Sequence, residues 1–314
     1  MLSERAKYSL YLLVLIPSIV CCLIVLSYLV FDRALRQALH NHAIIIILFL
    51  TLIQQVTIYP WMIHFSIREG EWQRSLIFCE IWTYLDWSIY ITQMILFAWA
   101  TMERHILIFH ERWLITKKNR FLIHYLPYIF ILLYCFNIYT MAFFYPPCEN
   151  LLKSSVSYCL SICLSNYYIF YMWESIVHQL IPVVIIVVFS IGLLVRTVWH
   201  KHRMHQAVQW RKHRKMTVQL LSITLVYLVF SFPSTVVYTA TFFISVEVVT
   251  DAAFQYTGFL SYFTFLVFPF VCALTLPGLR KKMKKTLNFR RRRATVHAMP
   301  LRTRPTIDPR QSTP

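Results

Sequence analysis

Residues 8–31 read YSLYLLVLIPSIVCCLIVLSYLVF, and no charged side chain interrupts them. A helix needs ~20 mostly apolar residues to cross the hydrocarbon layer of a membrane, so this stretch is long enough to span it. A secretory signal would have a shorter apolar core and a cleavage site of small residues. The stretch is therefore predicted to be a retained transmembrane helix.

Similar apolar stretches recur along the whole chain, and only 14% of the residues are charged, against about 25% in soluble domains. The stretches lack the alternating pattern of a membrane β-barrel, so helices are expected. We predict an all-α membrane protein, a bundle of seven transmembrane helices. The predicted spans are approximately residues 8–31, 41–67, 79–106, 121–147, 172–197, 214–246 and 252–276.

The orientation follows from the basic residues, because cytoplasmic segments retain an excess of Lys and Arg. One side of the predicted bundle holds 26 of them and the other holds 5, which together make the 31 of the chain. The amino terminus is therefore predicted to be outside, with residues 1–7 as a short extracellular segment. On the inside we expect a basic tail over residues 290–314. Basic segments placed between apolar spans favour binding to an anionic lipid leaflet and not to nucleic acid.

The third span carries two features at a fixed distance. Cys79 lies at its outer end, and Glu103, Arg104 and His105 follow at its inner end. This pattern resembles that of the rhodopsin-like, or class A, G-protein-coupled receptors, in which a cysteine and an acid–arginine–aromatic triplet have the same spacing. The prolines of the fifth, sixth and seventh spans also resemble those of the family and are expected to act as helix hinges. They are Pro182, Pro233 and Pro269.

The resemblance implies a multi-pass receptor of the plasma membrane that transmits the binding of an extracellular ligand to a heterotrimeric G protein. It also implies an amphipathic eighth helix over residues 277–289, on the cytoplasmic side. Arrestin and a receptor kinase are implied as further partners, and neither an enzymatic activity nor a cofactor is implied. In the inactive state Glu103 would hold Arg104, which activation would free to meet the G protein. Thr295 follows the basic residues 290–293 and is a candidate phosphorylation site.

Several departures from the family pattern indicate a divergent receptor of an invertebrate type. Thr51 occupies the position of the acid that helps to bind sodium, and the asparagine of the first helix is missing. The sixth span reads Phe230-Ser231-Phe232-Pro233, without the usual tryptophan, and the seventh reads FPFVC over residues 268–272. The resemblance therefore does not imply a sodium-linked switch or a tryptophan toggle.

Four cysteines lie on the predicted outer side, where an oxidising environment preserves disulfides: Cys79, Cys148, Cys159 and Cys163. Four cysteines allow three pairings, and the residues alone do not choose among them. The resemblance implies one bridge from Cys79 to the second outer loop. We expect Cys163 as its partner, which leaves Cys148 with Cys159.

The candidate ligand-binding residues are polar groups placed among apolar ones. Asp86 lies about two helical turns below Cys79, and a carboxylate at this depth is functional by default. The resemblance places it where amine receptors hold a ligand cation, with Tyr262 as its hydrogen-bond partner. A purely structural bond between Asp86 and Tyr262 is the alternative. Glu174 and His178 are four residues apart on one helix face and would either contact a ligand or form an interface hydrogen bond.

Other functions were weighed against a receptor of this family. A chemosensory receptor of another seven-helix family would share the topology and the departures. A transporter would show paired halves, which the chain lacks, and a membrane enzyme would need converging titratable groups. A metal site at His200, His202 and His205 is disfavoured by their strongly basic surroundings.

The orientation can be tested with epitope tags. We expect antibody to reach a tag inserted after Lys7 on intact cells, and a tag after Pro314 only once the cells are permeabilised. Immunofluorescence with and without detergent measures both. Reversed accessibility would overturn the orientation and the cytoplasmic placement of Arg104.

Overall fold

The computed structural model describes residues 4–67, 75–155, 158–203, 207–241 and 251–276. The chain divides into two units, Met1–Leu276 and Pro277–Pro314, and all described residues belong to the first. The predicted eighth helix, the basic tail and Thr295 lie outside the described residues. So do the side chains of His200, His202 and His205.

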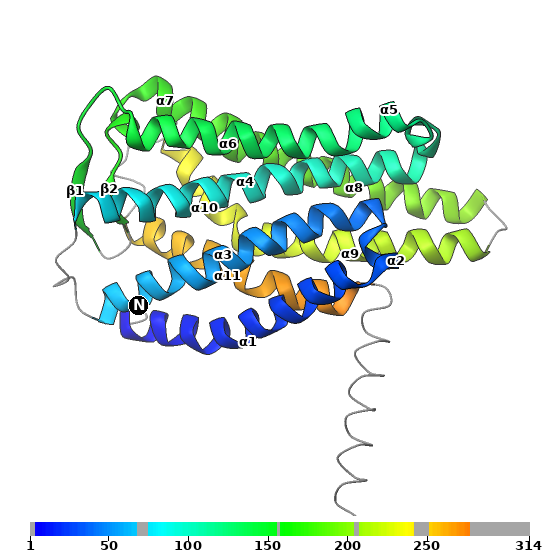
Figure 1. The fold of residues 1–314 in the computed structure, drawn as a ribbon, viewed down its shortest axis with the longest axis horizontal. Coiled ribbons are helices and arrows are strands. Elements are labelled where there is room, and N and C mark those ends of the chain that lie inside the picture. The colour runs from blue at the N-terminus through cyan, green and yellow to red at the C-terminus, as the bar shows by residue number, and fades with distance from the viewer. Residues whose placement is uncertain (1–3, 68–74, 156–157, 204–206, 242–250, 277–314) are drawn as a thin grey trace, which may run out of the picture. The chain divides into compact units, whose positions relative to one another are not determined.

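Seven long helical segments lie side by side in the first unit and form a helical bundle (Figure 1). Short elements join them: α2 (Arg33–Arg36), η1 (Glu111–Leu114), α5 (Lys117–Arg120) and η3 (Cys163–Asn166). The seven segments, in chain order, are α1 (Glu4–Phe31), α3 (Leu39–Ile67), α4 (Leu76–Phe109), η2 (Phe121–Tyr125) continued by α6 (Leu126–Phe144), α7 (Tyr168–Trp173) continued by η4 (Glu174–Leu180) and α8 (Ile181–Arg203), α9 (Ala207–Phe230) with α10 (Phe232–Ala240), and α11 (Asp251–Thr275).

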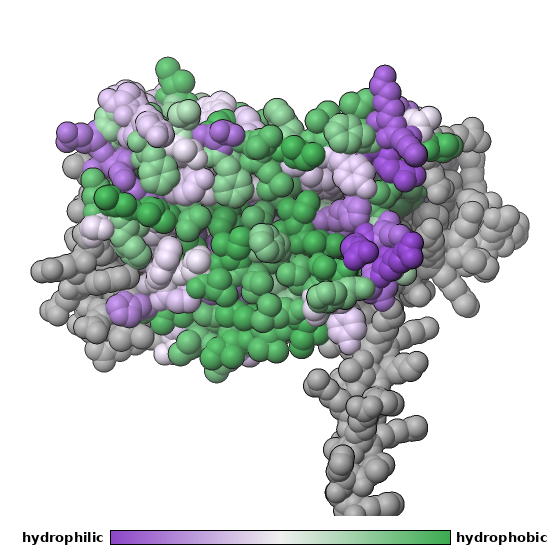
Figure 2. Space-filling model, in the orientation of Figure 1, coloured by the Kyte–Doolittle hydropathy of each residue, from purple (hydrophilic) through white to green (hydrophobic). Residues whose placement is uncertain are grey.

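The outward faces of the helices are apolar. Five described helices are long and apolar enough to cross a membrane, and the bent pair Thr217–Phe230 and Phe232–Ala240 makes a sixth. Outward side chains such as Leu13 and Phe130 are 71% and 64% exposed. In Figure 2 apolar side chains cover the middle of the visible face, and hydrophilic ones gather toward the two ends. This is the surface expected of a protein whose middle lies in lipid.

Helix α4 is the remaining long segment and lies at the centre of the bundle. It packs against α3, α6 and α8, so much of its surface is buried by protein. A helix in this position does not need an apolar face toward lipid. It can therefore carry polar side chains such as Asp86, Gln93 and Glu103, which the neighbouring helices must satisfy.

Prolines lie in several of the segments and coincide with irregularities in three of them. The bend of 42° between α9 and α10 falls just before Pro233, whose ring removes one helical hydrogen bond and displaces the preceding turn. Pro127 and Pro182 each follow a short π-helix, η2 and η4 respectively. Pro269 lies inside α11.

The outer loop between α6 and α7 contains a β-hairpin, which the all-α prediction did not include. Strands β1 (Leu151–Ser155) and β2 (Tyr158–Ser161) pair in antiparallel fashion. They are short and belong to a connection, so the bundle remains the fold.

A disulfide joins Cys148 to Cys163 and flanks this hairpin. The expected pairings of Cys79 with Cys163 and of Cys148 with Cys159 were therefore wrong. Cys148 and Cys163 lie at the two ends of the folded loop, with Cα atoms 5.9 Å apart, which the spacing along the chain did not reveal. Cys79, at the start of α4, is itself disulfide-bonded, and the side chain of Cys159 lies outside the described residues.

Candidate functional site

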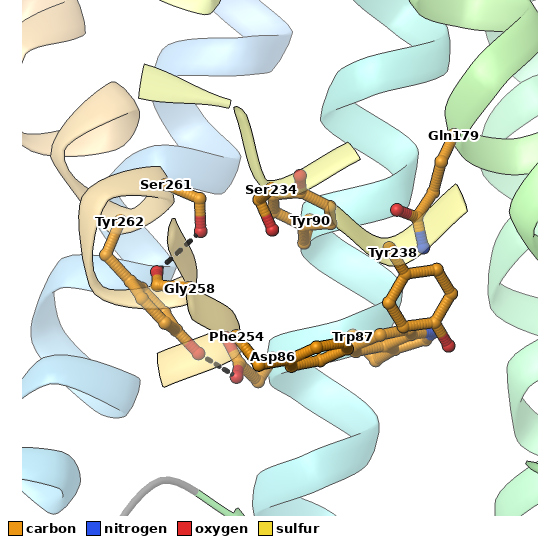
Figure 3. Close-up of a pocket in the computed structure, with 10 residues that line it drawn as sticks. All are labelled: Asp86, Trp87, Tyr90, Gln179, Ser234, Tyr238, Phe254, Gly258, Ser261 and Tyr262. Atoms are coloured by element: carbon orange, nitrogen blue, oxygen red, sulfur yellow. Dashed lines mark hydrogen bonds between the residues drawn. The ribbon is translucent and has the colours of Figure 1, made fainter. Parts of the chain in front are cut away.

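A small cavity of about 60 Å³, partly open to solvent, lies between α4, η4, α10 and α11 (Figure 3). Aromatic rings form much of its lining, together with one carboxylate and a few neutral polar groups. The lining residues are Asp86, Trp87, Tyr90, Gln179, Ser234, Tyr238, Phe254, Gly258, Ser261 and Tyr262.

Asp86 is the acidic residue of this cavity, and its partners are neutral. Tyr262 of α11 donates a hydrogen bond from its hydroxyl to Oδ2 at 2.5 Å, and Gln54 of α3 donates from Nε2 to Oδ1 at 3.4 Å. The structure thus brings Asp86 and Tyr262 together, as Figure 3 shows. Among the lining residues that the structure describes, no side chain is cationic. A negative charge on Asp86 is therefore hydrogen-bonded but not balanced by the walls.

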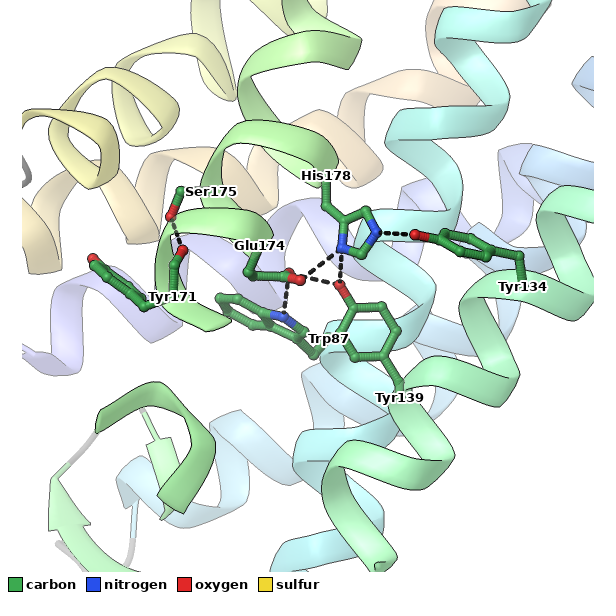
Figure 4. Close-up of polar contacts among 7 residues, drawn as sticks. All are labelled: Trp87, Tyr134, Tyr139, Tyr171, Glu174, Ser175 and His178. Atoms are coloured by element: carbon green, nitrogen blue, oxygen red, sulfur yellow. Dashed lines mark hydrogen bonds and ion pairs between the residues drawn. The ribbon is translucent and has the colours of Figure 1, made fainter. Parts of the chain in front are cut away.

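Glu174 and His178 form a second polar group, which is buried beside the cavity (Figure 4). Nδ1 of His178 lies 2.6 Å from Oε2 of Glu174. The other carboxylate oxygen accepts from Nε1 of Trp87 at 3.0 Å and from the hydroxyl of Tyr139 at 2.6 Å. Tyr134 contacts Nε2 of His178 at 3.0 Å and completes the group.

These contacts join three helical segments, because Trp87 comes from α4, Tyr139 and Tyr134 from α6, and the acid–histidine pair from η4. Neither Glu174 nor His178 is among the residues that line the cavity. In this arrangement Glu174 and His178 form hydrogen bonds at an interface between helices, which is one of the two alternatives given above for them. Trp87 belongs to both sites, since its ring lines the cavity while its N–H is bonded to Glu174.

At the other end of α4, Glu103 and Arg104 are buried, with 1% and 3% exposure. The carboxylate of Glu103 is hydrogen-bonded to Nδ1 of His124 and to the hydroxyl of Tyr128. Both partners come from the next long segment, η2 and α6. Glu103 therefore ties the inner end of α4 to a neighbouring helix, in addition to lying beside Arg104 in the sequence.

His105, the third member of the triplet, faces α8. Its Nε2 lies 2.8 Å from Nη1 of Arg196, whose guanidinium also lies over the ring of Phe109 at 4.6 Å. A cation held over an aromatic face in this way is stabilised electrostatically. The inner end of α4 is thus in contact with segments on both of its sides.

Comparison with known protein families matches residues 22–271 to the 7 transmembrane receptor (rhodopsin family). The chain belongs to this family. It is therefore a G-protein-coupled receptor, a multi-pass membrane protein that answers an extracellular ligand by acting on a G protein. A search of curated proteins finds no match.

Among solved structures, the receptor is similar to the crystal structure of squid rhodopsin, with a TM-score of 0.69 and 16% sequence identity. The likeness covers 92% of this chain and 87% of that one. At such low identity it shows that the two share the seven-helix fold.

The departures from the family pattern have visible substitutes in the core of the receptor. Thr51 donates to the carbonyl of Ile47 at 2.8 Å and accepts from Nε2 of Gln93 on α4 at 3.3 Å. Gln55 donates to the hydroxyl of Ser18 and to the carbonyl of Phe265 at 2.9 and 3.0 Å. Neutral amide and hydroxyl groups thus join α1, α3, α4 and α11 where an acid was expected.

The sequence analysis did not predict the hydrogen-bond partners of the buried acids Glu103 and Glu174. The fourth predicted span has no Asp, Glu, Lys or Arg that would have drawn attention to a polar site. It contains three of these partners, which are His124, Tyr128 and Tyr139. Their spacing of four and eleven residues places them near one helix face, and this signal was available. Which acids they would meet depends on how the helices pack, and the pattern of one helix does not contain that information.

The role of Tyr139 in the receptor can be tested with Tyr139→Phe, which removes only the hydroxyl. Glu174 would lose a hydrogen bond to a buried carboxylate, so we expect a loss of stability of about 1–3 kcal/mol. Thermal unfolding of the purified receptor measures it. Tyr145→Phe is the matched control, since Tyr145 is 73% exposed and its removal should change stability by less than about 0.5 kcal/mol. Equal effects of the two changes would contradict a structural role for Glu174.

Proposed function

We propose that the extracellular ligand of this receptor is a cationic amine or a peptide with a cationic group, bound in the cavity at Asp86. The observation that carries the proposal is the carboxylate of Asp86 in an aromatic cavity that offers it neutral hydrogen-bond donors and no cation. A ligand cation would supply the missing charge. Charge-assisted hydrogen bonds are roughly twice as strong as neutral ones.

The lining of the cavity supports the same class of ligand. Trp87, Tyr90, Tyr238 and Phe254 provide aromatic faces, which attract cations and stack on flat groups. Gln179, Ser234 and Ser261 provide neutral polar groups for the rest of the ligand.

We propose further that the receptor acts in the plasma membrane and meets the G protein at the end of the bundle that carries Arg104. The basic residues of the inner loops and tail would hold this end against anionic lipid. Arrestin and a receptor kinase are the further partners that the family suggests. Ligand binding would shift the population of conformations only through its higher affinity for the active one.

The ligand class is tested by Asp86→Asn, which keeps the shape of the side chain and its ability to accept from Tyr262 but removes the charge. After a screen of amines and short peptides has supplied agonists, we expect the dose–response curve of a cationic agonist to shift to at least about tenfold higher concentration. An uncharged agonist should be little affected. Equal shifts for charged and uncharged agonists would show that Asp86 serves packing alone.

The role of Arg104 is tested by Arg104→Ala. We expect surface expression to remain and ligand-stimulated nucleotide exchange on the G protein to be lost, because the buried guanidinium is the group that would meet the G protein. Arg120→Ala, at the exposed last position of α5, is the control and should preserve exchange. Exchange at the wild-type level in Arg104→Ala would leave Arg104 a structural end residue.

A further inference from the structure

A chain of hydrogen bonds leads from the surface of the inner end to the buried carboxylate of Glu103. Nε2 of His42 lies 2.7 Å from the carbonyl oxygen of Arg36, and its Nδ1 lies 2.7 Å from Nε2 of His124. Nδ1 of His124 is bonded to Oε1 of Glu103, whose Oε2 accepts from Tyr128. His42 is half-buried, whereas His124 and Glu103 are buried.

The partners in this chain fix the direction of each hydrogen bond. A carbonyl oxygen only accepts, so Nε2 of His42 must carry a proton, and in a neutral ring Nδ1 is then an acceptor. Nε2 of His124 must donate to it, which leaves Nδ1 of a neutral His124 as an acceptor. That acceptor faces the carboxylate of Glu103, which also only accepts when ionised. Two neutral imidazoles and an ionised carboxylate cannot complete the chain.

We propose that His42, His124 and Glu103 form a proton-binding site, which holds one proton more than two neutral imidazoles and a carboxylate carry. With this proton every contact has one donor and one acceptor. The proton can reside on His42, on His124 or on Glu103, and the three arrangements share it as one titrating unit. In each of them the three side chains together are neutral, which lowers the cost of burying them.

The other titratable and charged groups described around the site come from α2, η2, α4 and α6. Tyr128 donates to Glu103 from α6. The ring of Tyr125 in η2 packs against both imidazoles, with centroid distances of 4.6 Å to His124 and 5.9 Å to His42. Arg104 follows Glu103 on α4 and is the buried cation next to the site. Arg36 contributes its carbonyl oxygen, and its guanidinium is turned toward the carbonyl of Val30 at 3.0 Å.

The site has a route to solvent and a link to receptor conformation. His42 is partly exposed at its bond to Arg36, so the proton can come from the aqueous phase at the inner end, the cytosol in the predicted orientation. Any conformation that parts Glu103 from His124 no longer needs the proton and releases it. The conformation with the closed chain binds one proton more, so it is stabilised at low pH and loses stability as pH rises. Because one proton is involved, the equilibrium constant between the two conformations can change by at most tenfold per pH unit.

The test uses the purified full-length receptor in lipid nanodiscs, with thermal unfolding followed between about pH 6 and pH 8, the range in which histidine titrates. Glu103→Gln and His42→Gln each supply an amide N–H to His124, so each completes the chain without the added proton. We expect the melting temperature of the wild type to fall with rising pH relative to both variants. His110→Gln changes a half-buried histidine that stacks on Trp113 outside the chain, and it should retain the wild-type dependence.

A spectroscopic measurement identifies the proton directly. With nitrogen-labelled histidine and infrared detection of carboxyl groups, the wild type at neutral pH should show an imidazolium or a protonated carboxylic acid that is absent from both Gln variants. The proposal is overturned if the wild type shows neither signal. It is also overturned if all four proteins share one pH dependence of melting.

Discussion

A carboxylate placed among apolar helices must find its hydrogen-bond donors within the bundle, and much of the polar structure of this receptor follows from that constraint. Asp86 obtains a donor from Tyr262 on α11, Glu103 from Tyr128 on α6, and Glu174 from Trp87 on α4. Each bond crosses between helices. The acids therefore act as fixed points that set how α4 sits against its neighbours, where apolar contact alone would specify the packing less uniquely.

Two of these acids are met in the same way. His124 lies in the π-helix η2, and His178 lies in the π-helix η4; each histidine bonds a buried glutamate, and each π-helix is followed by a proline. A proline displaces the carbonyl of the preceding turn, and a π-helical turn widens the helix and redirects its side chains. Local irregularity and polar pairing thus coincide at both ends of the bundle. Such π-turns are frequent at functional sites.

The sequence was sufficient to predict the seven-helix bundle and the receptor family, because hydrophobic length and motif spacing are local properties. It also placed Asp86 and Tyr262 at a shared depth through the family resemblance. It could not predict the partners of Glu103 and Glu174, since those depend on the rotation of one helix against another. The predicted partner of Cys148 was also wrong. The folded hairpin brings Cys163 close to Cys148, and the spacing along the chain does not reveal this.

Helix α6 is held at both of its ends. Tyr128 bonds it to Glu103 of α4 near one end, and near the other Thr140 donates to the hydroxyl of Tyr84 of α4 at 3.2 Å while Tyr139 bonds Glu174. Because α6 is hydrogen-bonded near both of its ends, it can neither slide along its axis nor rotate about it without breaking these bonds. These hydrogen bonds therefore hold α4 and α6 together as one unit. The segment of α9 and α10 differs from this pair, because its helical hydrogen bonding is interrupted at Ser231 and its two halves meet at an angle of 42°.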